Sequence, residues 1–168
     1  SAIHRPIVFA TIALALLLPA QAWSQPTSGP ARPPTTQPAR EDLYDTKADA
    51  KAQIAAAAET AQRENQRVLV MFGGNWCGWC HKLHNLFKSD EGIAKTLRYE
   101  YQLVLIDVGR FDKNLDLAGG YGADPKKNGV PFLVVLGADG KALAAQETGA
   151  LEDGDHHDAK KVAAFLEK

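Results

Sequence analysis

The feature that most constrains this chain is the pair Cys77 and Cys80, which are its only two cysteines. They are spaced C-x-x-C between an apolar run at 68–72 (VLVMF) and a stretch at 82–87 (KLHNLF) whose apolar residues recur at helical spacing. The run is typical of a buried strand and the stretch of an amphipathic helix. The sequence therefore predicts that both cysteines lie at a strand-to-helix junction, with Cys77 at or near the first turn of the helix.

This position favours redox chemistry at the two sulfurs. The first N–H groups of a helix have no partners within the helix, and the helix dipole adds partial positive charge there. We therefore expect the thiolate of Cys77, which is the reactive form, to be stabilised. Cys80 lies three residues further on the same side and can attack a mixed disulfide formed at Cys77. The pair predicts a dithiol–disulfide couple with Cys77 as nucleophile and Cys80 as resolving thiol.

Three other interpretations of the cysteines remain open. A purely structural disulfide is one, although so short a loop adds little stability. A zinc site completed by His81 and His84 is another, although structural zinc usually draws its ligands from two separated pairs. The run CGWCH also matches the attachment motif of c-type haem. Haem usually takes a second axial ligand, and the single methionine, Met71, lies in the preceding strand, where it cannot easily reach the far haem face.

Two motifs resemble those of the thioredoxin superfamily. Residues 76–80 (WCGWC), directly after a strand, resemble its active site, and residues 129–135 (GVPFLVV) resemble its cis-proline segment with the following strand. The resemblance covers residues 68–149. It implies an α/β, thioredoxin-like fold in which helices flank a mixed β-sheet, as a single domain at 42–168. It also implies an oxidoreductase whose partners are protein or peptide thiols and disulfides. No cofactor is expected, because the disulfide itself carries two electrons.

The resemblance also implies roles for three residues around the cysteines, and the aromatic side chain of Trp79, where many thioredoxins carry proline, suggests a role for a fourth. The bond between Val130 and Pro131 would be cis, and Pro131 would shape a substrate groove beside the sulfurs, whereas alone it would indicate an ordinary proline at a strand start. The backbone of Val130 would pair with an extended substrate. Trp76 would support the site, and Trp79 would offer substrate an apolar contact or simply shield the core.

Two features depart from the pattern of the superfamily, and one is that the lysine often paired with a buried acid has no counterpart in the wholly apolar run at 103–106 (LVLI). Many thioredoxins carry a buried aspartate six residues before the first cysteine, as proton acceptor for the second cysteine, but this chain has Met71 there. Deprotonation of Cys80 would then depend on water, His81 or a carboxylate from elsewhere. The direction of electron flow and the recycling partner stay open. A non-enzymatic binding, chaperone or redox-sensing module is the alternative function.

The first 41 residues predict export. Arg5 precedes an apolar core at 7–18 that is too short to span a bilayer comfortably, and a small-x-small pattern ends at Ala22. Residues 1–22 therefore predict a signal peptide, with an uncleaved anchor as the alternative. Residues 23–41 predict a disordered, proline-rich linker. We expect a periplasmic or secreted protein, where disulfides persist, with no stable membrane span after cleavage.

Cleavage would leave 146 of the 168 residues, enough for one domain, and loss of Arg5 would change the formal net charge from −1 to −2. This balance gives no indication of nucleic-acid binding. Residues 47–65 predict a leading helix capped by Asp45 or Thr46, and Asp158 is expected to cap the last helix. Residues 122–128 and 152–158 predict polar loops, the second of which is also a weak candidate for a divalent metal. Strands are predicted at 68–72, 101–107, 132–136 and 142–148.

Overall fold

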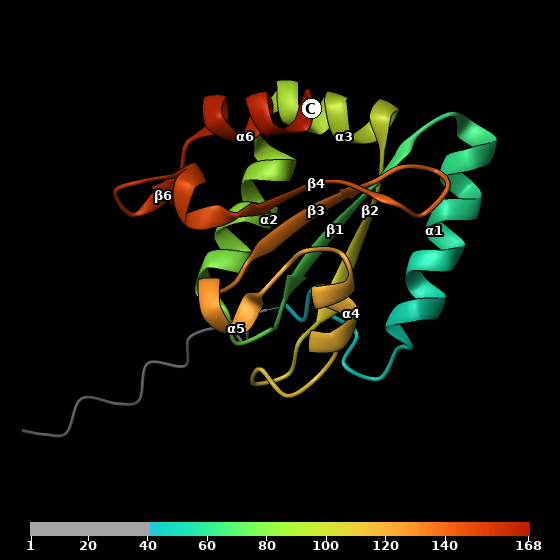
Figure 1. Cartoon of the computed structure of the whole chain (residues 1–168). Coiled ribbons are helices and arrows are strands. Elements are labelled where there is room, and N and C mark those ends of the chain that lie inside the picture. The colour runs from blue at the N-terminus through green and yellow to red at the C-terminus, as the bar shows by residue number, and fades with distance from the viewer. Residues whose placement is uncertain (1–40) are drawn as a thin grey trace, which may run out of the picture. The chain divides into compact units, whose positions relative to one another are not determined.

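The computed structural model describes residues 41–168, so the predicted signal peptide and the predicted linker up to residue 40 lie outside the described residues. Four strands form one sheet in the order β2-β1-β3-β4 (Figure 1). β1 and β2 are parallel, whereas β3 is antiparallel to both β1 and β4. The prediction of a mixed sheet is confirmed. The strands are β1 (Arg67–Gly73), β2 (Tyr101–Asp107), β3 (Phe132–Leu136) and β4 (Ala142–Glu147).

The central strand β1 is buried on both faces because successive side chains of a strand point to opposite sides. Leu69 and Met71 face one core, whereas Val68, Val70 and Phe72 face the other. All five have no exposed surface. Burial on both faces explains why this strand has an uninterrupted apolar sequence instead of an alternating one.

Helices cover both faces of the sheet (Figure 1). The core that contains Met71 is closed by α2 (Gly78–Ser89), α3 (Glu91–Glu100) and α6 (Ala159–Leu166). The opposite core is closed by α1 (Ala50–Glu64) and α4 (Leu115–Gly120). This three-layer arrangement confirms the predicted α/β fold. The remaining elements are α5 (Pro125–Asn128), a 3-10 turn (Thr148–Leu151), β5 (Glu152–Asp153) and β6 (His156–His157).

Three local predictions need correction. The first helix is capped by Asp49, whose side chain accepts a hydrogen bond from the backbone N–H of Ala52, and not by Asp45 or Thr46. Residues 125–128, predicted as loop, form the short helix α5, because Asp124 caps it and its first residue is a proline. The predicted loop at 152–158 contains the two-stranded hairpin β5–β6. The expected cap at Asp158 is confirmed.

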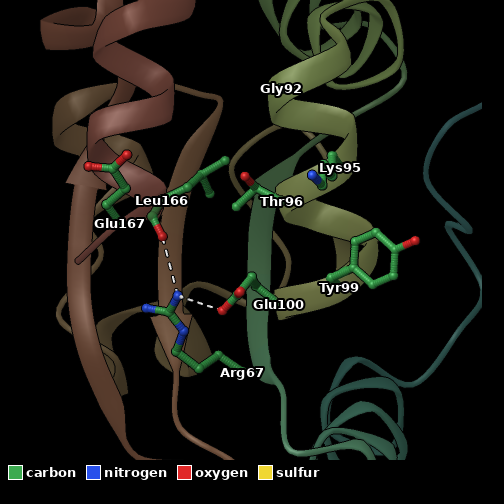
Figure 2. Close-up of a pocket in the computed structure, with 8 residues that line it drawn as sticks. All are labelled: Arg67, Gly92, Lys95, Thr96, Tyr99, Glu100, Leu166 and Glu167. Carbon is green, nitrogen blue, oxygen red and sulfur yellow. Dashed lines mark hydrogen bonds and ion pairs between the residues drawn. The ribbon is translucent and has the colours of Figure 1, made fainter.

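A groove of about 550 Å³ opens at the other end of the sheet from the cysteines. Figure 2 shows Arg67 at its base, between Glu100 on α3 and Leu166 on α6. The guanidinium of Arg67 donates to the carbonyl of Leu166 at 3.3 Å and lies 3.8 Å from the Glu100 carboxylate. These contacts tie the end of α6 to β1.

Within residues 41–168, no helix is long and apolar enough to cross a membrane.

Candidate active site

The two cysteines lie at the predicted junction between β1 and α2. Cys77 is the N-cap of α2, with an extended backbone (φ −82°, ψ 105°), and its sulfur accepts a hydrogen bond from the backbone N–H of Cys80 at 3.0 Å. Cys77 and Cys80 are joined as a disulfide. The first turn of the helix therefore directs an N–H group at the sulfur of Cys77. The predicted placement of both residues is confirmed.

The two cysteines differ in burial. Cys77 keeps 4% of its surface exposed, whereas Cys80 has none. Both belong to the core that contains Met71 and Leu83, so the position that carries an aspartate in many thioredoxins is filled by an apolar side chain in this core. An attacking molecule can therefore approach this disulfide only from the side of Cys77.

The segment that contains Pro131 lies against the disulfide. The Val130–Pro131 bond is cis, as predicted from the resemblance. The carbonyl oxygen of Val130 lies 3.5 Å from the sulfur of Cys77, and Val130 is half-buried. The carbonyl of Pro131 accepts a hydrogen bond of 2.6 Å from the buried hydroxyl of Thr148. The structure therefore brings the two predicted groove residues to the cysteine that is partly exposed.

Trp76 joins the active-site loop to the loop after β2. Its indole N–H donates to the carbonyl of Gly109 at 2.6 Å, and its ring makes an edge contact with Phe111 at 5.4 Å between centroids. The guanidinium of Arg110 lies 5.1 Å from the ring centre. Trp76 nevertheless stays 37% exposed, so part of its ring borders the solvent beside the disulfide.

Trp79 is half-buried and has a contact with the β5–β6 hairpin that the sequence analysis missed. The ring of His157 on β6 meets the Trp79 ring edge-on, with 5.1 Å between centroids. The ammonium of Lys82 lies 4.3 Å from the centre of the same ring. His157 is buried, and neither of its ring nitrogens has a hydrogen-bond partner. The hairpin therefore supports the tryptophan that stands between the cysteines.

The metal interpretations find no support in the side-chain positions. Among residues 41–168, no three His, Cys, Asp or Glu side chains come together as a metal site would require. His156 is exposed beside Asp155, whereas His157 turns inward onto Trp79. Nε2 of His81 lies 2.9 Å from the carbonyl oxygen of Asn75. In the disulfide state, neither cysteine has a free thiol for zinc or for haem attachment.

Acid is expected to destabilise the protein through His157. Burial, followed by the positive charges of Lys82 and His156, lowers the pKa of His157 from 6.5 to about 4. Between these values the unfolded chain binds a proton that the native protein does not, so stability falls as the pH falls from 6.5 towards 4. His157→Phe keeps an aromatic contact with Trp79 and should lose part of this dependence, as measured by urea midpoints across the pH range.

The exposed neighbour provides the matched control for this experiment. His156→Gln should keep most of the acid sensitivity of the unmodified protein, because burial, the largest cause of the lowered pKa of His157, is unchanged in this variant. His84 also has a pKa lowered by burial, so some sensitivity should remain in every variant. Equal loss of stability in His157→Phe and the unmodified protein over this pH range would contradict the assignment.

Sequence reasoning also missed the segment that precedes α1. The side chain of Asn75 accepts hydrogen bonds from the backbone N–H groups of Leu43 and Tyr44, both at 2.8 Å, and donates one to the carbonyl of Tyr44 at 2.9 Å. These three bonds hold residues 43–44 on the loop directly before the disulfide. The one signal in the sequence was a polar side chain immediately before Trp76, which gives no indication of its partner.

Comparisons with known proteins agree with this geometry. A profile of the family described as "Thioredoxin-like" matches residues 49–138. The solved structure of a disulphide isomerase from Xylella fastidiosa Temecula1 is 32% identical, covering 74% of this chain and 94% of that chain, with a TM-score of 0.65. The oxidised C-terminal domain of DsbD from Neisseria meningitidis is 19% identical, covering 71% of this chain and 95% of that chain, with a TM-score of 0.51. No curated protein sequence matches.

Proposed function

Because this chain belongs to the thioredoxin-like family, we propose that it is a thiol–disulfide oxidoreductase acting on the thiols and disulfides of proteins or peptides. The observation that carries the proposal is the position of Cys77. Its sulfur caps a helix and accepts a hydrogen bond from the backbone N–H of Cys80. Cys77 is also the more exposed of the two bonded cysteines. A helix N-terminus favours the thiolate over the thiol, and the thiolate is the attacking species.

In the proposed reaction, the reduced protein attacks a substrate disulfide through Cys77. A bond forms between the sulfur of Cys77 and one substrate sulfur, and the other substrate sulfur leaves as a thiolate. The thiolate of Cys80 then attacks the sulfur of Cys77, which restores the Cys77–Cys80 disulfide and releases the second substrate thiolate. Two electrons pass to the substrate, and the reverse sequence oxidises a substrate dithiol.

The surroundings of Cys77 support a binding groove for an extended substrate. Val130 presents a backbone carbonyl beside the sulfur, and Pro131, next to it, is fixed by Thr148. We propose that the backbone of Val130 pairs with the substrate in the manner of an added strand. Trp79 would contact apolar side chains of the substrate, and Trp76 would hold the far rim through Gly109.

Isomerisation of protein disulfides is the first direction to test, because the 32%-identical relative is described as a disulphide isomerase. Cytoplasmic glutathione and thioredoxin systems keep thiols reduced, so such a reaction suits an oxidising compartment. We propose that residues 1–22 are a signal peptide and 23–41 a linker, and that the domain acts in the periplasm or outside the cell.

The experiment is to measure turnover and the reduction potential together. A catalytic amount of the protein should convert many equivalents of a substrate with scrambled disulfides. Equilibration with glutathione, followed by tryptophan fluorescence, should give a potential nearer to about −180 mV for an isomerase than to about −270 mV for a reductant or about −120 mV for an oxidase. Absence of any reversible Cys77–Cys80 disulfide would overturn the proposal.

A second candidate function has one observation in its favour. Met71 puts an apolar side chain in the core of both cysteines, where many thioredoxins have a carboxylate that serves the resolving thiol. A redox-sensing or chaperone module needs no rapid resolution. Each molecule of such a protein would form the disulfide reversibly but would react with at most about one substrate molecule, so the turnover measurement separates the two candidates.

A further inference from the structure

The geometry points to Tyr44 as a further residue of this redox site: its hydroxyl donates a hydrogen bond to the sulfur of Cys80 once the disulfide is reduced. The inference rests on the proposed function, because it concerns the same couple. The Tyr44 hydroxyl would favour the dithiol over the disulfide. Tyr44 lies in the segment before α1, outside the motifs at 76–80 and 129–135.

Gly73, the last residue of β1, shows how near the two groups are. A Cβ atom at Gly73 would lie 2.3 Å from the hydroxyl oxygen of Tyr44 and 2.6 Å from the sulfur of Cys80. Both atoms therefore border one space that a single methyl group would fill. The absence of a side chain at Gly73 leaves open this space that the hydroxyl and the sulfur both border.

The hydroxyl of Tyr44 has no hydrogen-bond partner in the disulfide state. Tyr44 is only 1% exposed, and its oxygen is buried without a donor or acceptor in reach. A buried hydroxyl without a partner is costly, so a group that supplies one is strongly favoured. A disulfide sulfur is a poor acceptor, whereas a thiolate is a charged one, and charge-assisted hydrogen bonds are stronger. Reduction frees the sulfur of Cys80 from its bond to Cys77, and the thiolate form of Cys80, the form that attacks Cys77, is this partner.

The Tyr44 side chain is fixed in this position from two sides. Asn75 forms two hydrogen bonds with the backbone of Tyr44 and one with that of Leu43, and these attach the segment to the active-site loop. The ring itself belongs to the core that contains Cys80, Met71 and Leu83. The hydroxyl therefore keeps its place next to Cys80 when the disulfide opens, and the freed sulfur can move into hydrogen-bond range.

Electrostatics keep Tyr44 a donor. Burial, and next the negative charge of Asp107, raise the pKa of Tyr44 well above its ordinary value of 10. Asp107 ends β2 opposite Gly73 and is itself buried, with Lys113 3.6 Å from its Oδ2. Tyr44 consequently remains protonated and cannot act as a base. Its proton is therefore available to an acceptor, and the two candidates are the unpartnered Oδ2 of Asp107 and, after reduction, the sulfur of Cys80, with which the hydroxyl shares the space at Gly73.

The consequence is a more oxidising disulfide. Reduction by two glutathione thiols transfers two electrons and two protons, breaks the Cys77–Cys80 bond and yields glutathione disulfide. Tyr44 gains a hydrogen bond only on the reduced side of this equilibrium. Its hydroxyl therefore shifts the equilibrium towards the dithiol, and removal of the hydroxyl shifts it towards the disulfide.

The test is the glutathione equilibrium of Tyr44→Phe. This variant keeps the ring and removes only the hydroxyl, so the equilibrium constant for disulfide formation should rise roughly tenfold, the effect of one such hydrogen bond. A tenfold change corresponds to a potential about 30 mV more negative. Tyr101→Phe is the matched control, because it removes a buried hydroxyl that donates to Leu166, at the other end of β2. Its potential should not change.

The outcomes separate this inference from the proposed function. A reversible disulfide in the unmodified protein, with an unchanged or less negative potential in Tyr44→Phe, overturns the role of Tyr44 alone. An equal negative shift in Tyr101→Phe also overturns it, because the effect would then be general. Failure of the unmodified protein to form a reversible disulfide would instead overturn the proposed function.

Discussion

Replacing Cys80 with serine is expected to trap the protein on its substrate as a mixed disulfide through Cys77. Cys77 keeps its helix cap position, and its exposed side still receives a substrate, so the first exchange proceeds. The second exchange needs the buried thiol of Cys80, which this variant lacks. Turnover should fall on the order of 10³-fold or more, as it does when one member of a catalytic unit is removed. The complex should appear on non-reducing gels and disappear with dithiothreitol.

Cys77→Ser provides the matched control, because it removes one sulfur and leaves the other in place. Cys80 is fully buried, so this variant should lose turnover equally and trap almost no substrate. Trapping by Cys77→Ser but not by Cys80→Ser would reverse the assignment of nucleophile and resolving thiol. Trapping by neither variant would favour the non-enzymatic alternative.

The parts of the fold predicted from sequence are those that local patterns encode. The apolar run at β1 identifies a strand buried on both faces, and the spacing of Leu83 and Phe87 identifies the inward face of α2. The C-x-x-C motif between these elements therefore gave the correct position for Cys77. The resemblance to thioredoxins predicted the second half of the site, since nothing in the sequence next to Val130 and Pro131 indicates that they lie against Cys77.

The missed parts depend on contacts between segments that are distant in sequence. Asn75 bonds to residues 31 and 32 positions earlier, and no periodicity marks such a pair. The pair His156 and His157 looked like candidate metal ligands because a sequence does not show that adjacent strand residues face opposite sides. In the structure one is exposed and the other supports Trp79.

The contacts around Cys80 show which polar group lies near its sulfur when position 71 carries a methionine instead of an acid. The sequence showed only that a polar group was missing from β1 below the cysteines. The structure has a polar group near Cys80, but Tyr44 supplies it from the segment before α1, and it is a donor instead of a proton acceptor. A donor stabilises the thiolate of Cys80 but does not take the proton from its thiol. This site should therefore depend on solvent or substrate thiolates for deprotonation of Cys80.

Replacing Gly73 with alanine is expected to destabilise the protein by about 1–3 kcal/mol, the usual cost of overpacking a buried site. The new Cβ would lie 2.3 Å from the hydroxyl oxygen of Tyr44, 2.8 Å from its ring carbon Cζ and 2.6 Å from the sulfur of Cys80. Neither neighbour can move away easily, because the Tyr44 ring is buried, the Tyr44 backbone is bonded to Asn75 and the sulfur is in a disulfide. Urea unfolding should measure the loss.

Two comparisons make the expected loss specific to this contact. Gly119→Ala is the control, because a Cβ there would meet nothing within 4 Å and alanine suits the interior of α4 better than glycine. Its stability should be unchanged or slightly higher. In a Tyr44→Phe background, Gly73→Ala should cost less, since the nearest clashing atom is gone and contacting residues do not act additively. An equal cost in both backgrounds would show that the Tyr44 hydroxyl does not limit the space at Gly73. A cost near zero in the otherwise unmodified protein would remove the close approach from which the role of Tyr44 was inferred.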